Sequence, residues 1–232
     1  MLEKMGVFFD ARLDGYEEHQ LTCIESAQEF YPFTTRCLPT GSVSILDLGC
    51  GTGLELEYYF PLSPDASVTG IDLAPGMLKA LREKFPDRKL TLIQGSYFDV
   101  PFGEYRFDAA VSVESLHHFT KEEKLPLYQK LHASLKDDGY FILTDYFAPT
   151  EQYEIFYHQE LLRLKAEQGI SDSEFYHYDT PLTVKHETEA LLTAGFSKVE
   201  ELGVWVNIFF NALWHKRRYR FCFMHSLSYH RG

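Results

Sequence analysis

The chain has 232 residues, of which 45% are hydrophobic and 24% are charged, and its formal net charge at pH 7 is −12. This composition is ordinary for a globular domain, and the negative charge argues against a nucleic-acid or anionic-membrane partner. The four cysteines form no CxxC pair, which favours reduced thiols in a cytoplasmic protein over a disulfide framework or a zinc site. The hydropathy pattern predicts neither a signal sequence nor a membrane span.

We expect residues 1–232 to form a single domain. Residues 1–42 are predicted to be an N-terminal helical cap, with a helix over 15–37 that is broken near Pro32, because proline cannot donate a backbone hydrogen bond inside a helix. Residues 43–147 alternate between short apolar strands and amphipathic helices. The predicted strands are 43–48, 67–72, 90–94, 107–113 and 140–146, and the predicted helices are 54–60, 75–84 and 121–135. This alternation predicts an α/β fold with a parallel sheet and helices on both faces.

A helical insertion over 148–182 and a C-terminal segment over 183–232 follow this core. Their predicted elements, in chain order, are a helix at 151–168, a loop at 175–181, a helix at 184–194, and strands at 197–202 and 204–214. Gly169 marks a turn after the first helix, and Gly195 suits the left-handed C-cap of the second. The two strands are predicted to be an antiparallel pair that turns around Gly203.

The run ILDLGCGTG at 45–53 is the most informative stretch of the chain. An apolar strand leads directly into Gly49, Gly51 and Gly53, which permit a tight turn and a close approach of a ligand to the backbone. A helix starts at once, and its first N–H groups are open to that ligand. The next strand ends in Asp72, at a distance along the chain that suits hydrogen bonds to ribose hydroxyls. These features together predict a nucleoside cofactor site.

Two cofactor classes fit a glycine-rich turn that is followed by a distant acid. A dinucleotide site has the spacing GxGxxG, whereas this chain has GxGxG, with Asp47 shortly before the first glycine. A carboxylate at that place repels a pyrophosphate but tolerates the ammonium and sulfonium groups of S-adenosyl-L-methionine. The spacing therefore favours S-adenosyl-L-methionine, and a nicotinamide oxidoreductase stays open as the less favoured class.

Four motifs of this chain resemble those of the class I S-adenosylmethionine-dependent methyltransferases. They are ILDLGCGTG at 45–53, GIDLAPGML at 70–78, FDAAVS at 107–112 and LKDDGY at 135–140. The resemblance covers residues 43–147 in the expected order. It implies a seven-stranded, mostly parallel, Rossmann-like sheet with an antiparallel last strand and a helical insertion after the fifth strand.

The resemblance also implies which residues contact the cofactor. Asp72 would bind both ribose hydroxyls, with Leu73 and Met77 against the adenine. The other expected contacts are Gly49, Gly51 and Gly53 at the methionine moiety, Asp47 and Cys50 in the same motif, Ser96 and Tyr97 beside the adenine, Glu114 near the sulfonium, and Arg12 and Tyr16 at the cofactor carboxylate. Purely structural roles stay open, with Asp72 as a helix N-cap, Met77 in the core, and Arg12 and Tyr16 in surface or lid packing.

The sequence indicates the catalytic residues less clearly than the cofactor contacts. Methyl transfer is an in-line displacement at an activated carbon, so a base is needed only where the acceptor must lose a proton. The candidate catalytic residues are His117 and His118, with Asp145 at the end of a strand as a further candidate. Because adjacent side chains in an ordinary loop point in different directions, we expect at most one of the two rings to face the pocket. No recognised ligand spacing is present, so we predict no metal site, with coordination by the histidines and Asp145 or Glu114 as the alternative.

The C-terminal third, from 151 to about 216, is distantly similar to the family that makes carboxy-S-adenosylmethionine for wobble-uridine modification. The shared elements are the helical insertion, TVKHETE at 183–189 and NALW at 211–214. That family depends on an arginine that holds the extra carboxylate, and residues 186–192 contain none. The similarity therefore supports the topology, and is compatible with a homodimer, without carrying that chemistry over.

The sequence as a whole predicts an S-adenosylmethionine-dependent methyltransferase that acts on O or N of a small molecule. The insertion and the N-terminal helix are expected to enclose this methyl acceptor. The alternative is a non-catalytic or variant cofactor-binding protein of the same fold. A basic cluster at 215–220 is interpreted as the solvated edge of a strand or tail, with a nucleic-acid contact as the less favoured interpretation.

Overall fold

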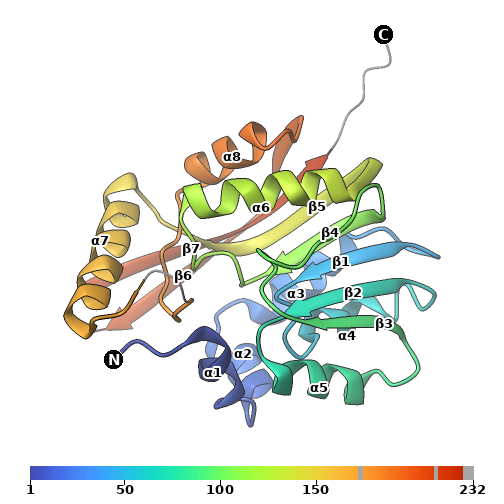
Figure 1. The fold of residues 1–232 in the computed structure, drawn as a ribbon, viewed down its shortest axis with the longest axis horizontal. Helices are drawn as coiled ribbons and strands as arrows, with labels where there is room; N and C mark the ends of the chain where they lie inside the picture. The colour runs from blue at the N-terminus through green and yellow to red at the C-terminus, as the bar shows by residue number, and fades with distance from the viewer. Residues whose placement is uncertain (172–174, 212–213, 227–232) are drawn as a thin grey trace.

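A computed structural model describes residues 1–171, 175–211 and 214–226, and their side chains as far as residue 205. A twisted central sheet lies between two layers of helices (Figure 1). The predicted α/β fold with a parallel central sheet and flanking helices is therefore confirmed. Within the described ranges, no helix is both long enough and apolar enough to cross a membrane.

The strands follow one another across the sheet in the order β3-β2-β1-β4-β5-β7-β6. The neighbours from β3 to β5 are parallel, whereas β7 is antiparallel to both β5 and β6. The described elements, in chain order, are α1 (Met5–Asp10), α2 (Tyr16–Cys23), α3 (Ala27–Arg36), β1 (Ser44–Leu48), α4 (Leu54–Tyr59), β2 (Ser67–Asp72), α5 (Pro75–Lys84), β3 (Lys89–Gln94), β4 (Phe107–Val113), α6 (Lys121–Ser134), β5 (Leu135–Phe147), α7 (Glu151–Gln168), α8 (Val184–Thr193), β6 (Lys198–Asn211) and β7 (Trp214–Ser226).

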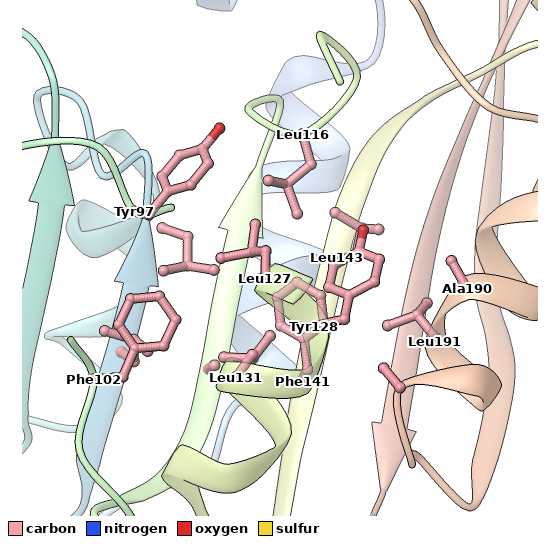
Figure 2. Packing of buried hydrophobic residues seen from close by; sticks show 14 of the residues in the cluster. Tyr97, Phe102, Leu116, Leu127, Tyr128, Leu131, Phe141, Leu143, Ala190 and Leu191 are labelled. Carbon is pink, nitrogen blue, oxygen red and sulfur yellow. The ribbon is translucent and has the colours of Figure 1, made fainter. Parts of the chain in front are cut away.

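Successive residues of the buried strands face opposite helix layers, as the pleat of a strand requires. Leu46 of β1 and Leu143 of β5 pack on the side of α6 and α8, where Figure 2 shows Leu143 beside Tyr128 of α6. Ile45 and Ile142, each one position away, pack on the side of α3 and α4. Two apolar cores thus hold the parallel strands in place, and their carboxyl ends form one edge where the loops converge.

Side-chain caps begin the helices α6, α7 and α8. Thr120 and Glu123 form a reciprocal capping box at the start of α6. The side chains of Thr150 and Thr183 accept backbone N–H groups at the starts of α7 and α8. At the other end of α7, Gly169 takes the left-handed conformation with φ of 63°. The cap and the glycine explain why α7 occupies the predicted range 151–168. Helix α5 has no side-chain cap and begins with Pro75, at its predicted start.

The break in the N-terminal helix does not lie at Pro32, as predicted. Helix α2 ends at Cys23, and the chain turns through Ser26, whose φ is 62°, before α3 begins. Pro32 lies inside α3, among the buried side chains of Phe30 and Tyr31. Proline removes a single backbone bond there, and the packing of the buried face keeps the helix continuous.

The predicted turn at Gly203 is also wrong. Gly203 lies within β6, next to a shift in register with β7, so the predicted strands 197–202 and 204–214 are one strand. A Cβ at this position would lie 2.9 Å from the Trp205 ring and 3.4 Å from Phe33. Close packing, and not a turn, therefore requires the glycine. The antiparallel partner is β7, which contains the basic cluster 215–220, whose side chains lie outside the described ones.

Candidate functional site

The glycine turn joins β1 to α4 through three left-handed residues. The φ angles of Gly49, Gly51 and Gly53 are 73°, 47° and 71°, a conformation that other residues rarely adopt. A Cβ on Gly49 would lie 2.0 Å from Oγ of Ser115. Above Gly51, by contrast, the nearest atom to such a Cβ is Oη of Tyr16, at 4.0 Å. The turn thus presents bare backbone to an open space that Tyr16 covers.

Asp72 ends β2 beside this turn. Its Oδ2 accepts the N–H of Gly51 at 2.9 Å, and its Oδ1 accepts the N–H of Ala74 at 2.8 Å. Burial raises the pKa of the carboxyl group, although the two backbone hydrogen bonds act in the opposite direction. Each carboxylate oxygen has a second lone pair. Asp72 can therefore hold the turn in place and still accept hydrogen bonds from the hydroxyls of a ligand.

A first pocket lies over the turn, between the ends of the strands and the N-terminal helices. It is lined by Met5, Phe9, Tyr16, Gly49, Gly51, Asp72, Leu73, Met77, Tyr97, Val113, Glu114, Ser115 and His118. The predicted contacts found in this lining are Tyr16, Gly49, Gly51, Asp72, Leu73, Met77, Tyr97 and Glu114, and those outside it are Arg12, Asp47, Cys50, Gly53 and Ser96. Most of the predicted contacts thus converge on one pocket.

The residues outside the lining support the turns around it. Gly53 is the N-cap of α4, and Cys50 is buried where its sulfur would be 2.7 Å from a Cβ on Gly70. Oγ of Ser96 accepts the N–H of Phe98 at 3.2 Å, so its hydroxyl caps the bend after β3. Sequence spacing places all of these residues near a ligand, and only the packing shows which side chains face it.

Asp47 lies beneath the turn, with 1% of its surface exposed. Burial and the neighbouring Glu55 raise the pKa of Asp47, and the two carboxyl groups are hydrogen-bonded to each other. Burial also raises the pKa of Glu55, to about 7. Together with Asp72 and Glu114, which line the first pocket, this pair makes the site strongly acidic. An acidic site suits a cationic ligand and disfavours a pyrophosphate.

The carboxyl pair of Asp47 and Glu55 should make the stability of the protein depend on pH. Both pKa values lie above the unfolded-state values of about 3.9 for Asp and 4.3 for Glu, so the folded protein binds more protons than the unfolded chain between about pH 4 and 7. The free energy of unfolding is therefore expected to fall as the pH rises through this window. The Asp47→Asn side chain can still donate a hydrogen bond to Glu55 but does not titrate. The free energy of unfolding of this variant should therefore fall less over the same pH range than that of the wild type. Urea melts at pH 4.5–7.5 test this, and equal slopes in wild type, Asp47→Asn and Glu55→Gln would contradict it.

A second pocket of about 600 Å³ adjoins the first. The two share Phe9, Tyr16, Glu114 and His118 as common walls. The rest of its lining consists of Phe8, Ala11, Arg12, Asp14, Gly15, His19, Gln20, Ile24, His117, Tyr146, His177 and Asp179. Helices α1 and α2 cover this pocket together with the segment before α8, which lies beside α1 in Figure 1.

Two segments far apart in the sequence form this cover. The N–H of Met5 donates to the carbonyl of Phe175, and the N–H of His177 to that of Glu3, both at 2.9 Å. The His177 ring stacks on Phe8 with 3.6 Å between centroids. Arg12 forms a two-point ion pair with Glu3, at 3.0 and 3.1 Å. Its guanidinium therefore belongs to the cover of the second pocket and not to the first pocket, where the sequence placed it.

His117 is held rigidly by a buried acid. Its Nδ1 lies 2.5 Å from Oδ1 of Asp145, whose Oδ2 accepts the N–H of Leu116 at 2.9 Å. Burial alone would lower the pKa of His117, but the attraction of Asp145 outweighs it, and the pKa is raised. The contact with Asp145 directs Nε2 of the ring toward the second pocket.

His118 has the opposite electrostatic environment. Burial, with repulsion from His117, lowers its pKa to about 3, so the ring is neutral at physiological pH. Its Nδ1 lies 3.1 Å from the carbonyl oxygen of Tyr178. Nδ1 therefore carries the proton and donates it to this carbonyl.

The expectation that at most one of the two rings faces the pocket is wrong. Both line the second pocket, with ring centroids 4.0 Å apart. Glu114, which opens this turn, has φ of 53°, a rare value for a residue other than glycine. The turn that contains the two histidines therefore departs from an ordinary loop, and both rings line one pocket.

Sequence reasoning missed most of the second pocket. Asp179 lies 3.5 Å from a nitrogen of each histidine, but it belongs to a segment predicted only as a loop. His177 and Tyr146 also line this pocket. No motif or spacing relates these residues to the glycine turn, and only the tertiary structure brings them together.

Comparison with known proteins agrees with this geometry. Residues 45–139 match a family model described as a methyltransferase domain. Over 225 residues the chain is 29% identical to the carboxy-S-adenosyl-L-methionine synthase of Wolinella succinogenes, and the match covers 88% of each chain. It is 31% identical over 101 residues to the fatty-acid O-methyltransferase of Mycolicibacterium smegmatis, a match that covers 44% of this chain and 36% of that enzyme.

Among solved structures, the YcgJ protein of Bacillus subtilis has the same fold, with a TM-score of 0.67 at 15% identity over 87% of this chain and 99% of that one. The family match contains the glycine turn, Asp72 and the two histidines. Helices α1 and α2 and Asp179 lie outside it. The first pocket is therefore built mainly from the matched range, whereas the cover of the second pocket is not.

Proposed function

We propose, for a chain that belongs to the class I S-adenosylmethionine-dependent methyltransferases, that the first pocket binds S-adenosyl-L-methionine and the second binds a small-molecule methyl acceptor. The main support for this proposal is that the two pockets have four wall residues in common, which are Phe9, Tyr16, Glu114 and His118. A sulfonium methyl at this boundary would face a bound acceptor directly. Alignment of this kind is the main requirement of an in-line displacement.

The first pocket fits the parts of this cofactor. Asp72 has lone pairs free for the ribose hydroxyls, and Leu73 and Met77 supply an apolar wall for the adenine. The open space above Gly51 accommodates the methionine backbone, under Tyr16. The carboxyl groups of Asp72 and Glu114, which line this pocket, favour an ammonium or sulfonium group. When bound, the cofactor supplies an activated methyl carbon.

We propose that the two histidines of the second pocket remove the proton that the acceptor must lose. A hydroxyl or protonated amine must lose its proton at or before attack, and a positioned imidazole accepts it. His117 suits this role because Asp145 holds its Nδ1 and stabilises the imidazolium that forms. His118 is neutral and lines both pockets, where it would contact both ligands.

A rival proposal keeps the cofactor but changes the chemistry. The relative from Wolinella succinogenes is named a carboxy-S-adenosyl-L-methionine synthase and matches over most of the chain. An added carboxylate needs a cationic partner, and Arg12, the one arginine among the described side chains that line the second pocket, is paired with Glu3. This arrangement favours ordinary methyl transfer.

Calorimetry with S-adenosylmethionine, S-adenosylhomocysteine and NAD tests the cofactor assignment, and binding of NAD alone would overturn it. Release of S-adenosylhomocysteine during incubation with a metabolite mixture then tests for turnover. Cofactor binding without release would identify a non-catalytic binding protein. Mass spectrometry of ligand released from the purified protein distinguishes S-adenosylmethionine from its carboxylated form.

A further inference from the structure

Three metal-ligating side chains converge in the second pocket, from two separate segments of the chain. His117 and His118 come from the turn after β4, and Asp179 comes from the loop before α8. Oδ1 of Asp179 lies 3.5 Å from Nε2 of His117 and 3.5 Å from Nδ1 of His118. Ligands held about 2.0–2.2 Å from a tetrahedral cation are separated by roughly 3.3–3.6 Å. The two separations from Asp179 are therefore those of ligands of one ion, and one ligand atom from each of the three residues lies within 4.8 Å of the others.

His117 is presented in the way that metal-binding histidines usually are. Its Nδ1 contacts the buried carboxylate of Asp145, which fixes the tautomer and leaves the lone pair on Nε2 facing Asp179. Asp145 is itself held by the N–H groups of Leu116 and Tyr146, each at 2.9 Å. The carboxylate–histidine arrangement of a metal site is thus present in full.

His118 requires one adjustment. Its Nδ1 donates to the carbonyl of Tyr178, so coordination through Nδ1 moves the ring proton to Nε2.

We propose that His117, His118 and Asp179 bind a divalent transition-metal cation of the zinc or ferrous class, with open positions toward the second pocket. Two imidazoles and one carboxylate with open positions are the ligand set of catalytic zinc and non-haem iron sites. Hard cations such as Mg²⁺ prefer oxygen ligands and are not favoured here.

Such a cation would determine which acceptors react. A hydroxyl group bound at an open position loses its proton to solvent, because the cation lowers its pKa. The resulting oxygen anion attacks the methyl carbon. The carbon–sulfur bond breaks with its electron pair going to sulfur, and S-adenosylhomocysteine leaves. This role rests on the proposed methyl transfer, whereas binding of the cation does not.

The two assignments of His117 exclude each other at any one moment. A ring whose Nε2 binds the cation has no lone pair for the acceptor's proton. Bound cation would therefore replace His117 as the agent that removes this proton.

Metal titration of the full-length, chelator-treated protein tests the proposal. Calorimetry with Zn²⁺ and the visible spectrum with Co²⁺ are expected to show one tight equivalent in wild type and in His158→Ala, an exposed histidine of α7. His117→Ala and Asp179→Asn should bind at least about 100-fold more weakly, and Asp145→Asn about 10–100-fold more weakly, as loss of an outer-shell partner usually costs.

Asp179→Asn keeps the size of the side chain at a partly exposed position, so it is expected to fold. Thermal melts and S-adenosylhomocysteine affinity confirm folding of each variant. Absence of tight binding in wild type, or unchanged binding in both His117→Ala and Asp179→Asn, would overturn the metal site. Because the titration contains no cofactor, this outcome leaves the cofactor assignment intact, and loss of S-adenosylhomocysteine binding with intact metal binding does the reverse.

Discussion

Replacing Asp72 by alanine is expected to weaken the binding of S-adenosylmethionine at least roughly tenfold, the value for loss of a single such hydrogen bond. The proposed hydrogen bonds from the ribose to this carboxylate are each worth about 1.5–3 kcal/mol. The substitution also removes the acceptors of the N–H groups of Gly51 and Ala74, at 2.9 and 2.8 Å, so the glycine turn loses its anchor to β2. Both effects act on the cofactor pocket. Calorimetry with S-adenosylhomocysteine measures the change without any need for an acceptor.

Asp10→Ala is the matched control for this substitution. Asp10 accepts the N–H of Gly76, in the first turn of α5, at 2.9 Å. It does not line the first pocket. Its removal should leave cofactor affinity within a few-fold of wild type. Asp72→Asn keeps one acceptor oxygen and should fall between wild type and Asp72→Ala. Equal affinity in wild type and a folded Asp72→Ala would show that the ribose does not lie at Asp72.

His117→Ala is expected to lower the rate of methyl transfer by about 10²–10⁴-fold, the usual contribution of a positioned general base. The affinity for S-adenosylhomocysteine should stay near that of wild type, because His117 lines the second pocket and not the first. The rate is measured as S-adenosylhomocysteine release with the acceptor that the metabolite mixture identifies. His177→Ala is the control, since its ring stacks on Phe8 in the same pocket and should cost less than tenfold.

The pH dependence identifies how Asp145 acts. A base must be unprotonated, so activity should rise with pH through the pKa of His117, which Asp145 raises above the ordinary value of about 6.5. Asp145→Asn removes this attraction, so the rise should move to lower pH while the maximal rate falls. NMR titration of the His117 ring in chelator-treated protein reports the same pKa without an acceptor. A ring that titrates at or below 6.5 in wild type would rule out this role for Asp145.

Local rules predicted the cofactor half of the molecule well. The strands at 67–72 and 107–113 and the helix at 75–84 have the predicted bounds, because each is set by its own apolar pattern and its own end signals. The glycine turn is predictable for the same reason, since its left-handed φ angles are properties of single residues. Asp72 follows from its place at the end of the next strand.

Local rules failed where a distant partner decides the conformation. Pro32 does not break its helix, because Phe30 and Tyr31 are buried on the helix's inner face. Gly203 does not make a turn, because its missing side chain admits the ring of Trp205. In each case a local preference of at most a few kcal/mol is outweighed by burial of large apolar side chains.

The sequence by itself determined the fold class, the methyl donor and most of the first pocket, because the run from Gly49 to Gly53 and Asp72 lies on consecutive strand–turn–helix units. Only the tertiary structure decided the second pocket. Asp145, Asp179 and the cover formed by α1 reach His117 from separate parts of the chain. Such contacts depend on how the elements pack, which no local spacing encodes, so the surroundings of His117 became visible only in three dimensions.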